Sequence, residues 1–184
     1  MVAGAPAAAA TETAVLAGGC FWGTEAVFEH VKGVQNVVSG FAGGTKGGLG
    51  RPVSERTGFA EAVRIRFDPA QVSYEQLLQI FMMVAHDPTQ IDRQGPDIGP
   101  RYRSAIFPQN AQQKQVAKGV LDQMRASGHF RKPIATRLES GGFDIAEEAH
   151  QDYVGKHPTS TYVVVNDLPK LAKLKNGYPQ LWRA

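Results

Sequence analysis

The chain has 184 residues, of which 42% are hydrophobic and 20% charged, and its formal net charge is +3. This composition is typical of a globular protein and too apolar for intrinsic disorder, and the length suits a single domain. The lysines and arginines are scattered, and no apolar stretch approaches the roughly 18 residues of a membrane span. We therefore expect one soluble domain with neither a nucleic-acid nor a membrane partner. We also expect a monomer, although the composition does not bear on the oligomeric state.

Residues 1–13 are rich in alanine and include Gly4 and Pro6. This composition predicts a flexible tail, followed by a single domain over residues 14–184. The tail lacks the basic start and long apolar core of a signal peptide, which favours a cytoplasmic protein. A periplasmic or exported protein whose signal has been removed would begin in the same way, so that location stays open.

Apolar periodicity predicts alternating strands and helices along the first part of the domain. The predicted elements are a strand at 15–16, a helix at 22–31, an apolar run at 34–41, a strand at 59–67 and a helix at 73–85. The glycine-rich residues 43–50 predict a mobile loop between the second and third of these strands. Ser73 and Gln76 have the spacing of a capping box, which places the start of the helix.

A polar segment rich in proline and glycine, residues 86–101, divides the domain. Its composition argues against any regular element and is typical of a functional loop. Further elements are predicted at 102–107 (strand), 110–128 (helix), 134–138 (strand), 146–154 (helix) and 168–175 (helix). The mixture of strands, helices and long irregular loops predicts an α+β fold, a two-layer sandwich with a central mixed sheet and a ferredoxin-like core.

Cys20 is the only cysteine of the chain, and it lies where Gly18 and Gly19 interrupt an apolar run just before a predicted helix. The free N–H groups at the start of a helix favour a thiolate, so we interpret Cys20 as a nucleophile. The alternative is a small buried hydrophobic residue, a common role for a lone cysteine. A single cysteine excludes an intramolecular disulfide and a multi-cysteine metal site, and we expect no bound metal or cofactor.

Three segments resemble the type A peptide methionine sulfoxide reductases. They are GGCFWGTE at 18–25, HDPTQ with the following RQG, DIG and RYRSAIF at 86–107, and AEE with HQDY at 146–153. The resemblance extends from about residue 14 to residue 175. It implies thiol-dependent reduction of the S epimer of methionine sulfoxide, free or within a peptide, and matches the rule of one reductase class per epimer.

A sulfoxide reductase needs a thiolate to attack sulfur, an acid to protonate the departing oxygen and an apolar wall for the methyl group. Cys20 is the expected nucleophile, and Glu25, whose side chain leans back along the helix, is the expected proton donor with a raised pKa. An interaction with the helix dipole is the other possible role of Glu25. From the resemblance, Tyr102 is expected to donate its hydroxyl to the sulfoxide oxygen and Asp97 to organise the polar side of the pocket.

The expected substrate-binding residues are aromatic: Phe21, Trp22, Phe41 and Phe59. Two of them depart from the family pattern, because Phe41 stands where a catalytic tyrosine is typical and Phe59 where a histidine is common. If the pocket is otherwise similar, one hydroxyl is missing and Phe41→Tyr should raise the activity.

The C-terminal part also departs from the family, since it has no resolving cysteine. Reduction should leave Cys20 as a sulfenic acid, which an external thiol must reduce: thioredoxin, or glutathione with glutaredoxin. Two other functions stay open. One is a methionine-sulfoxide-binding module with impaired catalysis, and the other is a cysteine hydrolase that uses His150 or His86 as its base.

Overall fold

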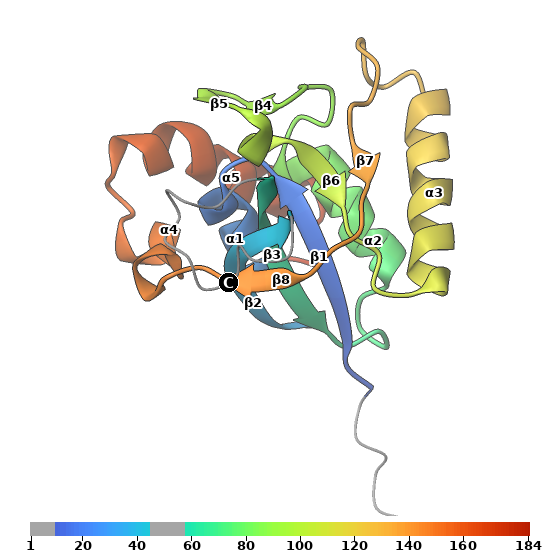
Figure 1. Ribbon diagram of the computed structural model, residues 1–184. Helices are drawn as coiled ribbons and strands as arrows, with labels where there is room; N and C mark the ends of the chain where they lie inside the picture. Colours follow the sequence, from blue (N-terminus) through green and yellow to red (C-terminus); the bar gives the residue numbers. More distant parts are fainter. Residues whose placement is uncertain (1–9, 45–57) are drawn as a thin grey trace, which may run out of the picture.

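The computed structural model describes residues 10–44 and 58–184, which form a six-stranded sheet with helices packed against it (Figure 1). The strand order is β7-β6-β1-β3-β2-β8, and all neighbours are antiparallel except β6 and β7. The strands are β1 (Glu12–Gly18), β2 (Val34–Gly43), β3 (Phe59–Phe67), β6 (Ser104–Ile106), β7 (Arg137–Leu138) and β8 (Phe143–Ile145). The predicted α+β fold with a central mixed sheet is confirmed.

The helices are α1 (Phe21–Glu29), α2 (Tyr74–Ile80), α3 (Ala111–Ala126), α4 (Tyr153–Lys156) and α5 (Leu168–Gly177). Two π-helical turns adjoin them, η2 (Phe81–Ala85) after α2 and η5 (Val163–Asp167) before α5. Within residues 10–44 and 58–184, no helix has both the length and the hydropathy of a membrane span.

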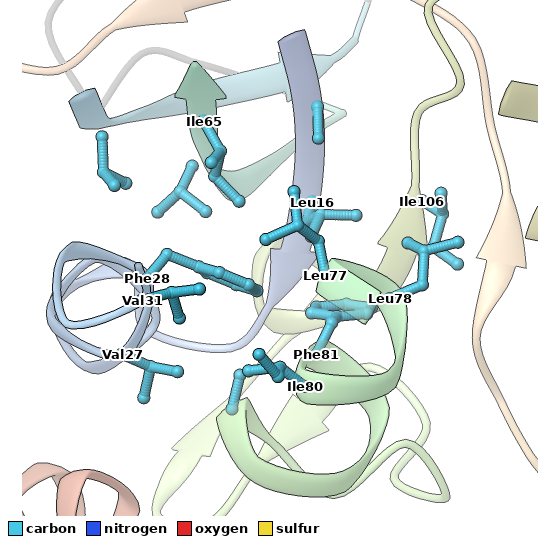
Figure 2. Packing of buried hydrophobic residues seen from close by; sticks show 14 of the residues in the cluster. Leu16, Val27, Phe28, Val31, Ile65, Leu77, Leu78, Ile80, Phe81 and Ile106 are labelled. Carbon is cyan, nitrogen blue, oxygen red and sulfur yellow. The ribbon is translucent and has the colours of Figure 1, made fainter. Parts of the chain in front are cut away.

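The main core lies between the sheet and helices α1 and α2 (Figure 2). Leu16 of β1 and Ile65 of β3 meet Phe28 of α1 and Leu77 of α2, and all four side chains are fully buried. The opposite face of the central strands carries small residues such as Ala60 and Ala105. Apolar side chains on both sides therefore hold β1 and β3 in place, and β1 ends at Gly18, two residues before Cys20.

The polar segment 86–101 contains regular structure, so the expectation that it holds none was wrong. Strands β4 (Arg93–Gln94) and β5 (Asp97–Ile98) form a hairpin, followed by the 3₁₀ turn η3 (Pro100–Tyr102). Gly95 has a φ of +55° in the hairpin turn, a conformation that glycine adopts without strain. Strands of two residues are too short to show alternation in the sequence.

Other boundaries also differ from the predictions. The helix predicted at 146–154 is replaced by the 3₁₀ turn η4 (Glu148–His150) and the short α4, with Asp152 between them in the left-handed region at φ +50°. Strand β1 begins at Glu12, inside the predicted tail, because it pairs with β3 as far as Phe67. Most of the predicted glycine-rich loop, and residues 1–9 of the tail, lie outside the described residues.

Candidate active site

Cys20 lies two residues after the end of β1 and is the N-cap residue of α1. The two residues before Cys20 must be glycines, because neighbouring side chains leave no room for a Cβ at either position. A methyl group on Gly18 would lie 2.8 Å from the Phe81 ring, and one on Gly19 would lie 2.4 Å from the Gln94 side chain. Gly19 also has a φ of +89°, which residues with a Cβ rarely adopt. The glycine pair therefore lets a buried strand turn directly into the helix and present the thiol there.

The Cys20 side chain is buried, with 8% of the residue exposed. Burial raises the pKa of the thiol well above its usual range, and the negative charge of Glu61 raises it further. A hydrogen bond from the Trp22 backbone N–H and one shared with the Tyr162 hydroxyl lower the pKa of the thiol and oppose that shift. The helix start is therefore not enough to ionise the thiol in the resting protein, because desolvation outweighs it.

Glu61 of β3 is the carboxyl group beside the thiol. Its Oε2 accepts a hydrogen bond of 3.3 Å from the backbone N–H of Phe21, the residue after Cys20. Burial raises the pKa of Glu61 to about 7, although the Phe21 N–H and the Arg101 charge oppose the shift. A carboxyl group with that pKa is protonated in part of the molecules at neutral pH, as a general acid must be.

Glu25 does not lie over the thiol, contrary to the expectation. Its Oε2 accepts a hydrogen bond of 2.9 Å from the Ser39 hydroxyl and one of 3.1 Å from the Asp152 backbone N–H. Burial raises the pKa of Glu25 to about 7, and the charged groups that act on this pKa are Glu29 and Asp152. The side chain of Glu25 thus connects α1 to β2 and to the segment before α4, and the expected contact with Cys20 is absent from the described interactions.

The aromatic residues after Cys20 form a cluster. The Phe21 ring meets the Phe41 ring edge-on, with centroids 5.6 Å apart. The Trp22 ring stacks on the Tyr153 ring, with centroids 3.6 Å apart, and meets the Tyr162 ring edge-on, with centroids 5.5 Å apart. The structure therefore gathers three of the expected aromatic residues around the start of α1: Phe21 and Trp22, which directly follow Cys20, and Phe41, which packs on Phe21.

Phe59 is buried at the start of β3, and its ring packs on the backbone of Gly44. No described contact connects this ring with Cys20 or with the other aromatic residues of the site.

The polar side of the site comes from segments that follow α2. Asp97 of β5 accepts a hydrogen bond of 2.5 Å from the hydroxyl of Tyr162. Burial raises the pKa of Tyr102, and the negative charges of Glu61 and Asp97 raise it further. Tyr102 therefore lies in the field of both carboxyl groups, and its hydroxyl is protonated at neutral pH.

Comparisons with known proteins show which family the chain belongs to. A family model described as peptide methionine sulfoxide reductase matches residues 12–181. A relative from Mesorhizobium japonicum, peptide methionine sulfoxide reductase MsrA 2, is 49% identical over 179 residues, which are 96% of this chain and 92% of the relative. The chain belongs to the peptide methionine sulfoxide reductase family. It is a type A enzyme, a peptide-methionine (S)-S-oxide reductase.

Solved structures of the family have the same fold as this reductase. The crystal structure of Mxr1 from Saccharomyces cerevisiae in reduced form has a TM-score of 0.70 and 30% identity, covering 82% of this chain and 87% of Mxr1. Mxr1 in complex with Trx2 has a TM-score of 0.52 and 25% identity, with coverage of 83% and 89%.

The two histidines considered as bases of a hydrolase have other partners in this reductase. His86 is buried between the Phe81 carbonyl at 2.8 Å and the Ser104 hydroxyl at 2.6 Å, and burial lowers its pKa to about 4. His150 accepts a hydrogen bond of 3.3 Å from the Trp22 indole N–H. In residues 10–44 and 58–184, no hydrogen bond joins either ring to Cys20, and no three potential metal ligands cluster.

Sequence reasoning missed two residues of this site, Glu61 and Tyr162. Alternation along β3 places Glu61 on the same side of the strand as Phe59, Val63 and Ile65, all of which are buried. A carboxyl group at a position predicted to be buried could have indicated a functional residue. Tyr162 has no comparable signal, because it lies in a polar stretch just before η5.

Proposed function

We propose that Cys20 attacks the sulfur of methionine S-sulfoxide while Glu61 donates a proton to the departing oxygen. The observation that supports this assignment is the buried Glu61 carboxyl on the Phe21 N–H, with its pKa raised to about 7 and its charge acting on Cys20. Because Glu25 is held by Ser39 and Asp152, the role of proton donor that we expected for it passes to Glu61.

The remaining site residues bind and orient the sulfoxide in this proposal. Tyr102 donates its phenolic O–H to the sulfoxide oxygen, and the Asp97 carboxylate organises the polar side. The Phe21, Trp22 and Phe41 rings form the apolar wall that receives the methyl group, and Phe59 contributes apolar surface at the flank. Peptide-bound and free methionine sulfoxide share the group that this pocket recognises, so both are substrates.

The first half-reaction transfers the sulfoxide oxygen to Cys20. The thiol and the sulfoxide give a sulfide and a Cys20 sulfenic acid, so sulfur of the substrate is reduced and sulfur of the cysteine is oxidised. One external thiol then forms a mixed disulfide with Cys20 and releases water, and a second thiol restores the cysteine. The chain has no other cysteine for these steps.

Thioredoxin is the reductant that the comparisons support, since Mxr1 was solved in complex with Trx2. Glutathione with glutaredoxin is the other donor of the same chemistry. We also propose that the protein acts as a monomer, in the cytoplasm, where a reducing thiol pool supplies the thiols that Cys20 needs.

A single-turnover experiment tests this function. The protein is mixed in excess with racemic N-acetyl-methionine sulfoxide, without reductant, and methionine product, both epimers and free thiol are counted. We expect loss of the S epimer alone, with about one thiol consumed for each methionine formed. Survival of both epimers and of the thiol would favour the binding module, and a Cys20→Ser variant that retains turnover would exclude the cysteine mechanism.

A further inference from the structure

The hydroxyl of Tyr162 lies between two groups that can exchange a proton. It is hydrogen-bonded to the sulfur of Cys20 and donates a hydrogen bond of 2.5 Å to Oδ2 of Asp97. Its ring is held edge-on against Trp22, and its backbone carbonyl accepts a hydrogen bond of 3.0 Å from the Asn166 side chain. The Tyr162 hydroxyl therefore lies between the sulfur of Cys20 and the carboxylate of Asp97.

The buried thiol needs such a connection because it must lose its proton before it attacks. Within the described part of the chain, no hydrogen bond joins His86 or His150 to Cys20, so neither ring is placed to accept this proton. The charged or titratable groups that act on Cys20 are Glu61 from β3, Asp167 and Tyr162 from the C-terminal segment, and Tyr102 from η3.

Neither of the two carboxyl groups in that set is well placed to receive the proton. Glu61 is the donor to the sulfoxide oxygen in the proposed mechanism. Asp167 is fully buried and paired with Lys170 at 3.3 Å, and no hydrogen bond connects it to Cys20 within the described part of the chain. Asp97 is the carboxylate that a path of hydrogen bonds connects to Cys20, through the Tyr162 hydroxyl.

We propose that Tyr162 is a further catalytic residue, which relays the proton of the Cys20 thiol to the Asp97 carboxylate. In the resting site, the S–H group donates to the phenol oxygen and the phenol donates to Asp97. In the activated site, each proton has moved one step along the path. The phenol then donates to the thiolate, and the neutral Asp97 carboxyl donates to the phenol.

The relay keeps the proton within the site, and this part of the inference rests on the proposed function. The thiolate attacks sulfur, Glu61 gives its proton to the oxygen, and the proton stored on Asp97 replaces the one that Glu61 has lost. The net change is one thiol and one sulfoxide converted to one sulfenic acid and one sulfide. Tyr162 also supplies a phenol to a site in which Phe41 lacks one, although this phenol acts on the thiol and not on the oxygen.

The pH dependence of Cys20 alkylation by iodoacetamide, measured without substrate, tests the relay. A thiol that gives its proton to water loses about tenfold in reactivity for each pH unit below its pKa. Where transfer to Asp97 is the main source of thiolate, the proton stays within the site and the thiolate population is nearly independent of pH. Between pH 7 and pH 5 we expect the wild-type rate to stay within about threefold. In Tyr162→Phe and Asp97→Asn we expect a fall of about tenfold per pH unit.

Tyr153→Phe is the matched control, because it removes a hydroxyl from the other tyrosine that packs on Trp22 and should leave the flat profile unchanged. Circular dichroism and thermal melting establish that each variant is folded, and Asp97→Asn carries the test if Tyr162→Phe does not fold. A flat profile in either variant, or a tenfold slope in the wild type, would overturn the relay. Because alkylation needs no sulfoxide, single-turnover reduction by the same variants shows separately whether the proposed function holds.

Discussion

Glu61→Gln is the substitution that separates the two glutamates of this site most clearly. The glutamine amide oxygen still accepts a hydrogen bond from the Phe21 N–H, which keeps the start of α1 in place, but the side chain has no proton to transfer to the oxygen. A positioned general acid contributes about 10²- to 10⁴-fold to the rate. We expect Glu61→Gln to lower the single-turnover rate constant by that factor, while Glu25→Gln lowers it by less than about tenfold.

The assay is rapid-quench single turnover with the S epimer of N-acetyl-methionine sulfoxide, followed across pH. A general acid must be protonated, and burial raises the pKa of Glu61 to about 7, so the wild-type rate should be full below that pH and fall above it. The decline should be absent in Glu61→Gln. A near-native rate in Glu61→Gln, or a larger loss in Glu25→Gln, would refute the assignment of the acid to Glu61.

Three further predictions test other parts of the structure. Phe41→Tyr should raise the single-turnover rate if its hydroxyl reaches the sulfoxide oxygen, whereas an unchanged or lower rate would show that the buried pocket is shaped for phenylalanine. Glu25 is 2% exposed, and its pKa in the folded protein is raised to about 7. Between about pH 4.5 and pH 7 the Glu25 carboxyl is therefore ionised in the unfolded chain but still protonated in the folded protein, so the free energy of unfolding declines as pH rises through this range. Urea denaturation across this pH range should show that Glu25→Gln removes up to about 3 kcal/mol of the decline. If the free energy of unfolding falls as steeply with pH in the variant as in the wild type, Glu25 is not the cause of the decline. In Gly19→Ala, the new Cβ would lie 2.4 Å from the Gln94 side chain, and the backbone would have to keep a φ of +89°. We expect this substitution to lower the free energy of unfolding by more than about 1 kcal/mol. Its control, Gly119→Ala in α3, meets no neighbour and should raise that free energy by about 0.5–1 kcal/mol.

The sequence by itself determined the features that depend on neighbouring residues. Gly18 and Gly19 before an amphipathic helix placed Cys20 at a strand-to-helix turn, and the structure has that turn, with Cys20 as the N-cap. Ser73 and Gln76 form the predicted capping box, with both hydrogen bonds present. The long periodic segments predicted β3 and α3 within a residue or two, because hydrophobic periodicity is set locally.

The tertiary structure decided which distant groups meet the thiol. Glu25 is five residues from Cys20, yet α1 directs its carboxyl toward Ser39 and Asp152. Glu61 lies on β3 and reaches the start of α1 because β3 pairs with β1 as far as Leu16 and Val63, two residues from Glu61. Tyr162 arrives with the C-terminal segment that packs over Trp22.

Burial also reversed one expectation drawn from local sequence. The N-terminus of a helix favours a thiolate, but the loss of solvent around Cys20 raises its pKa by more than the helix start lowers it. Desolvation depends on every segment that covers the thiol, most of which are far away in the sequence. The identity of the nucleophile was therefore readable from the chain, whereas its ionisation and its proton partners depend on the folded arrangement.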